Sequence, residues 1–315
     1  MSSELYHPLG CVPFDNPNEE CGVIGLFTPE GEASRLAFFG LFALQHRGQE
    51  SAGIAAANGE HVVVHADMGL VTQIFREPDF YPLAGNMAIG HTRYSTSGSS
   101  ELCNAQPLLV DGQHGQLAVA NNGNIINAVQ LKEQLQDEWN CTFTSTTDTE
   151  VIAQMLAHAI GTTWEERVFQ CMRQLEGAYS IVIQTKDSMI AARDPLGIRP
   201  LCLGKLNGGW IVASESCALD HLGAEYLREV EPGEVVIVDG NGLHTATWPG
   251  GTGRRSLCVF ELIYFARPDS VMDGQLVHSA RQQLGAQLAR EHPVEADLVI
   301  GIPDSSTAAA VGYAQ

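Results

Sequence analysis

Cys21 is the residue whose type and position point most directly to chemistry. It begins an apolar stretch, residues 21–27, with the composition of a strand, and it follows twenty residues that end in Glu19 and Glu20. Cleavage after Glu20 would give Cys21 a free α-amine beside its thiol. Because an α-amine has a pKa of about 7.7–8.0, it can take the thiol proton near neutral pH. The sequence therefore predicts an N-terminal cysteine nucleophile that needs no catalytic histidine, with residues 1–20 as a removable propeptide.

Other stretches hold groups that suit attack of a thiolate on the side-chain amide of glutamine. The oxyanion of the intermediate needs donors, and the Asn122 side chain with the backbone N–H of Gly123 would supply them. The far end of glutamine is a zwitterion, for which Arg93 and Asp148 are the candidate ligands. Each stretch alone has an ordinary explanation, because free cysteines are usually buried, Asn-Gly usually forms a turn, and helices often start with an acid. Only their combination indicates catalysis.

Composition limits the other classes of function. The chain has 315 residues, enough for one large or two ordinary domains, and its net charge of −20 argues against general nucleic-acid binding. Its eight cysteines include no Cys-x-x-Cys pair, so neither a compact zinc site nor a disulfide framework is indicated. The first twenty residues lack a secretory signal, and no apolar run is long enough to span a membrane. We therefore expect a cytoplasmic protein that binds neither nucleic acid nor membrane.

Apolar periodicity predicts an α+β protein with many short strands, arranged as two sheets that helices cover on their outer faces. The expected strands are residues 21–27, 53–57, 61–66, 87–91, 116–120, 179–184, 189–193, 210–213 and 234–238. The expected helices are residues 34–46, a segment that ends near Leu135, and a segment that starts with a Thr147–Glu150 capping box. Residues 121–124 are expected to form a turn.

The pattern changes after residues 248–253, where proline and glycines interrupt both periodicities. A helix over residues 276–291, a buried strand over 298–302 and a helix after Ser306 follow, in the order of a parallel α/β sheet. We therefore expect a first domain over residues 21–250 and the start of a truncated second domain over residues 251–315.

Five motifs, in their order along the chain, resemble the class II glutamine amidotransferase domain. They are Cys-Gly-Val-Ile-Gly from Cys21, Leu-Gln-His-Arg-Gly-Gln-Glu-Ser from Leu44, Gly-His-Thr-Arg-Tyr-Ser-Thr from Gly90, Asn-Asn-Gly-Asn from Asn121 and Thr-Asp-Thr-Glu from Thr147. The resemblance continues to about residue 240 and implies the N-terminal-nucleophile fold, a four-layer αββα sandwich. It implies that Cys21 is the nucleophile and that Asn122 and Gly123 form the oxyanion hole. It also implies that glutamine is bound by Arg47, Gly48, Arg93 and Asp148.

The second part resembles the amidophosphoribosyltransferase family in its propeptide-bearing form, on stretches that begin at Cys258, Val277 and Gly301. This resemblance implies a type I phosphoribosyltransferase domain, in which ammonia from glutamine attacks phosphoribosyl pyrophosphate (PRPP) to open purine synthesis. Ser305 matches a position that meets the Mg²⁺ bound with PRPP. Cys258 matches a ligand of the [4Fe-4S] cluster of some members, whose other ligands would lie beyond Gln315. A homotetramer and feedback inhibition by purine nucleotides are also implied.

Two other functions stay open at this point. One is a different class II amidotransferase, which aminates a sugar phosphate or forms asparagine, although such relatives normally begin at Met-Cys without a leader. The other is a non-catalytic sensor of PRPP or nucleotides. The family's PRPP motif, consecutive aspartates followed by a short flexible loop, does not occur in this sequence. We therefore expect this chain to hydrolyse glutamine once processed, and not to transfer ammonia to PRPP by itself.

Overall fold

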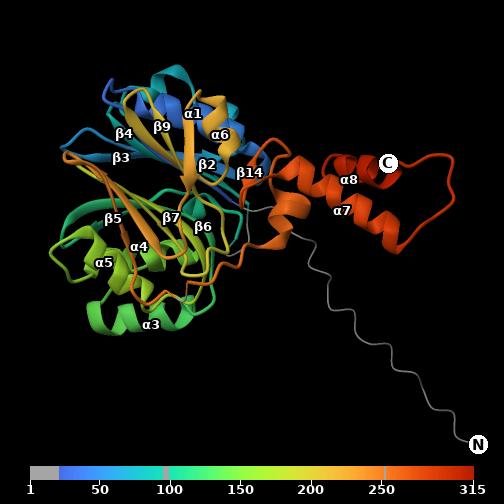
Figure 1. Ribbon diagram of the computed structural model, residues 1–315. Helices are drawn as coiled ribbons and strands as arrows, with labels where there is room; N and C mark the ends of the chain where they lie inside the picture. The colour runs from blue at the N-terminus through green and yellow to red at the C-terminus, as the bar shows by residue number, and fades with distance from the viewer. Residues whose placement is uncertain (1–20, 95–98, 252) are drawn as a thin grey trace, which may run out of the picture.

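Two antiparallel sheets packed face to face form the body of the protein (Figure 1). The structure is a computed structural model and describes residues 21–94, 99–251 and 253–315. The predicted propeptide, residues 1–20, lies outside the described residues, as do Ser95 and Thr96 of the third motif.

The first sheet has seven strands within the described ranges, in the order β11-β9-β10-β1-β4-β2-β3. They are β1 (Gly22–Phe27), β2 (Ser51–Ala57), β3 (Val62–Met68), β4 (Met87–Arg93), β9 (Cys202–Leu206), β10 (Gly209–Ala213) and β11 (Glu225–Glu229). An apolar cluster joins its outer face to three helices, α1 (Ala33–Ala43), α2 (Val71–Ile74) and α6 (Ser216–His221). Ile24 and Leu26 of β1 point into this cluster.

The second sheet has six strands in the same part of the chain, in the order β13-β12-β8-β7-β6-β5. They are β5 (Leu108–Gly112), β6 (Gly115–Ile125), β7 (Gly177–Thr185), β8 (Met189–Arg193), β12 (Glu234–Asp239) and β13 (Gly242–Thr247). Its outer face packs against α3 (Ala128–Trp139), α4 (Asp148–His158) and α5 (Trp164–Met172) through a second apolar cluster.

A third apolar cluster fills the space between the sheets. Side chains alternate between the two faces of a strand, so each central strand contributes to an outer cluster and to this inner one. Val23 and Ile89 of the first sheet meet Ala120 and Val182 of the second. The order of layers is therefore helix, sheet, sheet, helix, which is the predicted four-layer αββα sandwich.

One local prediction is wrong: residues 121–124 do not form a turn. They belong to β6. This strand pairs with β7 from Leu117, opposite Thr185, to Ile125, opposite Gly177. Asn and Gly are poor strand formers, and here the hydrogen-bonding neighbour overrides their local preference.

The C-terminal part is also only partly as predicted. Helix α7 (Val277–Glu291) and helix α8 (Ser306–Ala314) lie where they were expected, after a π-helix (Glu261–Phe265) and a hairpin of β14 (Val271–Met272) and β15 (Gln275–Leu276). Residues 298–302 are neither a strand nor buried, because Leu298, Ile300 and Ile302 are 76%, 81% and 83% exposed. A strand needs a hydrogen-bonded neighbour, and among the described residues none pairs with this segment.

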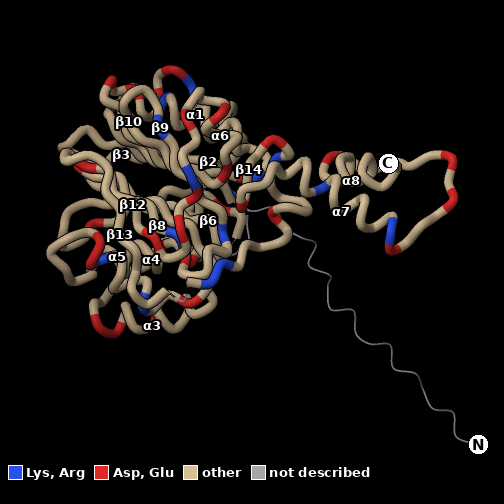
Figure 2. The backbone as a smooth tube through the Cα atoms, viewed as in Figure 1, with Lys and Arg blue, Asp and Glu red and all other residues tan. Residues whose placement is uncertain are grey.

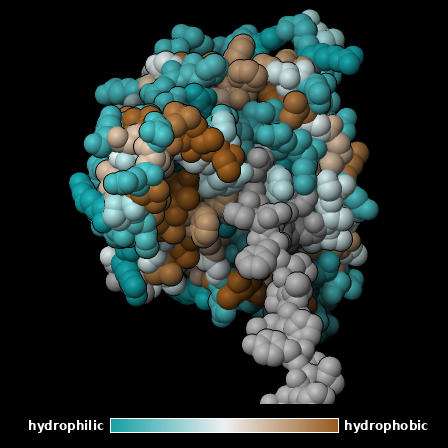
Figure 3. Space-filling model, turned by 90° about the vertical axis from the view of Figure 1, so that its right-hand side faces the viewer, coloured by the Kyte–Doolittle hydropathy of each residue, from teal (hydrophilic) through white to brown (hydrophobic). Residues whose placement is uncertain are grey.

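The surface reflects the acidic composition. Figure 2 shows Asp and Glu spread over both halves of the sandwich, whereas Lys and Arg occur in short, separate segments. Apolar side chains gather on the face seen in Figure 3, and an apolar hollow of about 680 Å³ lies between α7, α8 and residues 299–303. None of the described helices has the length and apolarity needed to cross a membrane.

Candidate active site

Cys21 lies at one end of the first sheet, directly before β1. Gly22 pairs with Thr92 of β4, and Arg93 of β4 pairs with Ser51 of β2, so Cys21 lies beside the end of β4. The Cys21 thiol donates to the Tyr94 carbonyl at 3.4 Å and is almost fully buried. The position predicted for the nucleophile is therefore a constrained one at a sheet end.

Strand alternation places three of the predicted site residues on the inner faces of the two sheets. Val23, Ile89 and Ala120 belong to the inner cluster. Cys21 is two residues before Val23 of β1, Arg93 is four residues after Ile89 of β4, and Asn122 is two residues after Ala120 of β6. Residues an even number apart on a strand point to the same face. The three side chains thus face the space between the sheets.

A hydrogen bond between the sheets shows that these strand ends are close together. His91 Nε2 of β4 donates to the Asn121 carbonyl of β6 at 3.1 Å. Burial lowers the pKa of His91 to about 3, so the imidazole is neutral and can donate from one nitrogen only. This bond brings the end of β4, with Arg93, beside the part of β6 that carries Asn122.

The Asn122 side chain has the features expected of a donor kept for a ligand, and Gly123 beside it is a position that only glycine fits. The Asn122 side chain is fully buried, and neither its Nδ2 nor its Oδ1 has a hydrogen-bond partner among the described residues. An unpaired buried polar group costs about 1–3 kcal/mol, which a ligand would recover. At Gly123, φ is +156°, and a Cβ would lie 2.0 Å from the Ala178 carbonyl oxygen, so only glycine fits.

Asp148 is anchored to the same strand. Its Oδ2 accepts from the Ile125 backbone N–H at 2.8 Å, which places the carboxylate at the end of β6, after Asn122. Burial raises the pKa of Asp148 above its ordinary value, against the opposing effect of its hydrogen bonds. The side chain is therefore a desolvated carboxylate in need of a cationic partner.

The capping box predicted around Asp148 forms only in part. The Thr147 side chain does cap α4, by accepting from Thr149 N–H at 2.9 Å. Glu150 does not return to the Thr147 backbone; it accepts from the N–H groups of Thr144 and Ser145 instead. This holds the segment before Asp148 in a fixed loop.

Gly48 and Arg93 touch each other. A Cβ on Gly48 would lie 2.5 Å from the Arg93 carbonyl carbon, so the absence of a side chain allows this close approach. The Arg93 guanidinium is nearly buried and donates to Glu50 Oε2 at 3.3 Å. Gly48 thus supports the backbone of Arg93.

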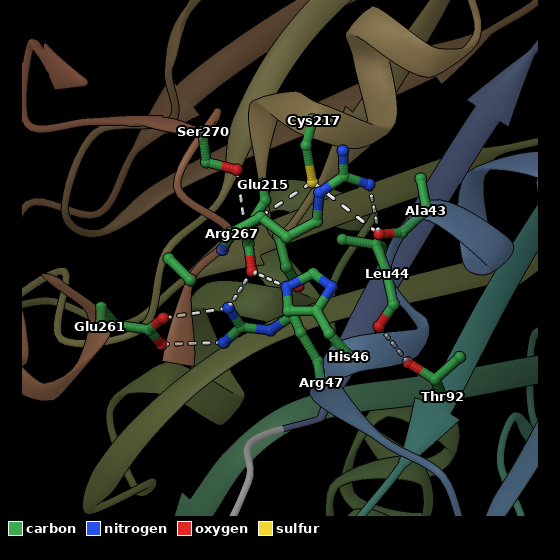
Figure 4. A network of polar contacts seen from close by, with 12 residues as sticks. Ala43, Leu44, His46, Arg47, Thr92, Glu215, Cys217, Glu261, Arg267 and Ser270 are labelled. Carbon is green, nitrogen blue, oxygen red and sulfur yellow. Dashed lines mark hydrogen bonds and ion pairs between the residues drawn. The ribbon is translucent and has the colours of Figure 1, made fainter. Parts of the chain in front are cut away.

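Arg47 does not have the predicted direct access to a substrate. Its Nε donates to the Cys21 carbonyl at 2.9 Å, and its Nη atoms donate to Glu215 and Glu261 at 2.6–2.9 Å (Figure 4). The side chain has no exposed surface. Its charge is matched inside the protein, and its Nε holds the backbone of Cys21, the predicted nucleophile.

The charges in this cluster stabilise one another. Burial alone would raise the pKa of Glu215, but His46 and Arg47 outweigh it and hold this pKa below its ordinary value. Burial alone would lower the pKa of Arg47, but Glu261 and Glu215 raise it above its ordinary value. Glu215 and Arg47 are therefore both ionised at neutral pH, as a buried ion pair requires.

The two residues expected to meet metals lie in the C-terminal part. Ser305 precedes α8 and borders a cavity of about 230 Å³ with Asp304, Arg267 and Arg281. Ser305 and Asp304 bring a hydroxyl and a carboxylate, which are oxygen ligands that Mg²⁺ accepts, whereas the two arginines would suit a phosphate group. The Mg²⁺ role of Ser305 stays a prediction. Cys258 is half-buried, and the described residues contain no group of three or more His, Cys, Asp or Glu placed to hold a metal. One thiol does not make a four-cysteine cluster site.

Sequence reasoning missed His91, Glu215 and Glu261 as parts of the site. His91 lies inside the third motif, and Glu215 lies in the stretch up to about residue 240 over which the resemblance continues; the sequence assigned neither a role. Glu261 is the only charged residue in the apolar run from Cys258 to Ala266, which is a signal for a buried acid with a partner.

Comparisons with known proteins agree with this geometry. A family model described as a glutamine amidotransferase domain matches residues 91–221. The amidophosphoribosyltransferase of Synechococcus elongatus is 45% identical over 100% of this chain and 65% of its own length. That of Bacillus subtilis is 47% identical over 95% of this chain and 62% of its own length.

A solved glutamine PRPP amidotransferase from B. subtilis, complexed with ADP and GMP, matches with a TM-score of 0.87 at 46% identity, over 93% of this chain and 63% of that one. The chain belongs to the amidophosphoribosyltransferase family. This match also confirms the N-terminal-nucleophile fold. The chain spans less than two thirds of the length of these relatives.

The neutral state of His91 predicts a specific pH dependence of stability. The unfolded chain binds a proton at this histidine below about pH 6.5, whereas the folded chain does not until about pH 3. His91 should therefore lower the free energy of unfolding by about 1.4 kcal/mol for each pH unit that the pH drops below 6.5. Urea denaturation between pH 7 and 4.5 measures it.

The His91→Asn variant is less stable at pH 7 because it loses the bond to Asn121 in this geometry, but its stability falls less steeply with acid. His61→Asn, which changes an exposed histidine, keeps the parent slope. Equal slopes for the parent and His91→Asn would contradict a buried neutral His91.

Proposed function

We propose that the sandwich, residues 21–250, hydrolyses the side-chain amide of glutamine at Cys21. The observation that carries this proposal is the buried amide of Asn122, which has no partner among the described residues. It lies on the inner face of the second sheet, opposite the inner face of the first sheet that carries Cys21 and Arg93. Such a group is costly unless a ligand pairs with it. The match to a glutamine amidotransferase model over residues 91–221 supports the same reaction.

In the first step, the α-amine of processed Cys21 takes the thiol proton, and the thiolate attacks the amide carbon of glutamine. The carbonyl oxygen becomes an oxyanion that accepts from Asn122 Nδ2–H and the Gly123 N–H. Removing one such donor typically costs about 10²–10³ in rate. When the C–N bond breaks, the protonated amine returns its proton to the leaving nitrogen, and ammonia departs from a thioester.

In the second step, water attacks the thioester, with the α-amine now acting as its general base. The thiolate leaves and glutamate is released. In both steps Arg93 binds the α-carboxylate and Asp148 the α-ammonium of the substrate. Gly48 supports Arg93 through its close approach, and Arg47 positions the Cys21 backbone without contacting glutamine.

For the full-length enzyme we propose the family's reaction, in which this ammonia displaces pyrophosphate from PRPP to give 5-phosphoribosylamine. Residues 251–315 then begin the phosphoribosyltransferase domain. Ser305, with Asp304 beside it, would contact Mg²⁺, which supplies charge neutralisation for the pyrophosphate. Cys258 would be one ligand of a [4Fe-4S] cluster only if three more cysteines join it, and no step here depends on the cluster.

The remaining properties of the full-length enzyme are proposed on family grounds. They are cytoplasmic location, a homotetrameric state and feedback inhibition by purine nucleotides; the last is supported by a relative crystallised with ADP and GMP. The names of the relatives also favour this enzyme over a sugar-phosphate aminating or asparagine-forming one and over a sensor. The net charge of −20 gives no support to a nucleic-acid partner.

The role of Cys21 predicts that activity depends on both its thiol and its freed amine. Chain that starts at Cys21 should hydrolyse glutamine, and N-terminal sequencing of active protein should read Cys-Gly-Val. Cys21→Ala should lower the rate by at least about 10³-fold, as expected for loss of a nucleophile. In the full-length protein, the same variant should keep ammonia-dependent transfer to PRPP.

Cys103→Ala removes an exposed free thiol and is the matched control, with activity equal to the parent. Full activity of protein that retains Met1, or glutamine hydrolysis by Cys21→Ala, would contradict the mechanism.

The role of Asp148 predicts a pH effect on KM for glutamine. The carboxylate binds the α-ammonium only when ionised, and burial raises its pKa, so KM should rise as the pH falls through this raised value. Asp148→Asn should raise KM about tenfold or more at pH 8, because it removes a hydrogen bond to a charged group. Its KM should no longer change with acid.

The acid loss of kcat, which reports the Cys21 amine, should remain in Asp148→Asn. Asp137→Asn removes an exposed acid of α3 and should keep the parent KM profile. If Asp148→Asn and the parent had the same KM at every pH, Asp148 would not bind the ammonium.

A further inference from the structure

The buried cluster around Arg47 connects the nucleophile to the segment that follows the sandwich. Arg47 Nε holds the Cys21 carbonyl, while Nη1 and Nη2 donate to the two carboxylate oxygens of Glu261 at 2.9 and 2.8 Å. Glu261 lies in the π-helix of the C-terminal part, and its side chain has no exposed surface. Figure 4 shows the Arg47 guanidinium between the carboxylates of Glu261 and Glu215.

The guanidinium is a rigid planar group, so its three nitrogens move together. Two parallel bonds to Glu261 fix both the position and the plane of the fork, and thereby the direction of Nε toward the Cys21 carbonyl. Glu215 contacts Nη1 alone, at 2.6 Å. Without Glu261, one remaining contact at Nη1 would let the guanidinium rotate and withdraw Nε from Cys21.

The bond to the Cys21 carbonyl matters because a processed Cys21 has no residue before it. Its backbone is then covalently joined to the rest of the chain only through its carbonyl carbon. The amine and the thiol both branch from the Cα next to that carbonyl, so its orientation sets where both reacting groups lie. Misplacement of reacting groups by about 1 Å can cost about 10²-fold in rate.

We propose that Glu261 is a positioning residue for Cys21 and acts through Arg47. The inference rests on the proposed role of Cys21 in glutamine hydrolysis. It means that the sandwich does not complete its own active site, because the segment after it supplies the group that fixes the nucleophile. Other contacts seat this segment: Ser270 Oγ donates to Glu215 at 2.6 Å, and the Val271 N–H donates to Ser216 Oγ at 2.9 Å.

The test uses chain that begins at Cys21, with Glu261→Gln, which keeps the size of the side chain and removes one of its two acceptors. We expect kcat for glutamine hydrolysis to fall by about 10–100-fold, with KM changed by less than about threefold, because substrate ligands are untouched. The rate at which a glutamine-like electrophile labels Cys21 under saturating conditions should fall with kcat.

The matched control is Glu234→Gln. Glu234 is also buried and forms a two-bonded ion pair, with Arg228, at 2.7 Å for both bonds, but that pair joins β11 to β12. Thermal unfolding should show a loss of stability for both variants, larger for Glu261→Gln because Arg47 is fully buried whereas Arg228 is 40% exposed. The kcat should fall only for Glu261→Gln. Glu261→Asp keeps the charge but shortens the reach, and should also lower kcat.

The outcomes separate this inference from the proposed function. If the parent neither hydrolyses glutamine nor reacts at Cys21, the proposed function fails. If the parent is active and Glu261→Gln retains kcat within about twofold, the positioning role is wrong. Where Glu261→Gln does not fold, the same criterion applies to Glu261→Asp. An equal loss of kcat in Glu234→Gln would also overturn it, since the effect would then follow from stability alone.

Discussion

The ion pairs of Arg47 join three segments that are far apart in the sequence. A guanidinium can be buried only where carboxylates and carbonyl oxygens receive its hydrogen bonds, and here Glu215, Glu261 and the Cys21 carbonyl do so. Such a cluster contributes little net stability compared with apolar packing, but it specifies geometry, because its members fit in one arrangement. The position of Cys21 at the end of the first sheet depends on this arrangement.

The sandwich places the other candidate groups through a simpler constraint. Alternation along β1, β4 and β6 turns Cys21, Arg93 and Asn122 toward the space between the sheets, while His91 ties the two sheets together at that end. The inner apolar cluster fills the rest of the space and excludes water from it. Groups for attack, charge recognition and oxyanion stabilisation therefore come from different strands of one rigid core.

Sequence reasoning predicted the layer order and most central strands, because buried strands such as 189–193 are apolar up to their last residue. It missed β5, β11 and β13, whose residues are partly exposed and whose pairing depends on a neighbour. It also missed β9, which is mostly buried but has Gly204 and Lys205 in its short apolar pattern. It misjudged residues 121–124 for the same reason, because strand pairing overrode the turn preference of Asn and Gly. The strand expected over residues 298–302 has no pairing neighbour among the described residues.

The candidate site was predictable as a set of residue types, and its connections were not. Cys21, Asn122, Arg93 and Asp148 have side chains whose chemistry can be recognised without coordinates. The roles of Glu215, Glu261 and His91 depend on hydrogen bonds between residues 30 to 214 positions apart, which no local pattern encodes. For Arg47, the local motif indicated a place near the nucleophile, and only the buried partners revealed that its charge is already matched.

The central claim is that groups from both sheets converge on glutamine bound at Cys21. A crystal structure of the processed chain, after reaction with a glutamine analogue that carries an electrophile at its side-chain end, measures this directly. It should show a covalent bond to Cys21 Sγ, the analogue's carbonyl oxygen at Asn122 and Gly123, its carboxylate at Arg93 and its ammonium at Asp148. An adduct at another cysteine, or one at Cys21 that points away from Asn122 and Asp148, would contradict the claim.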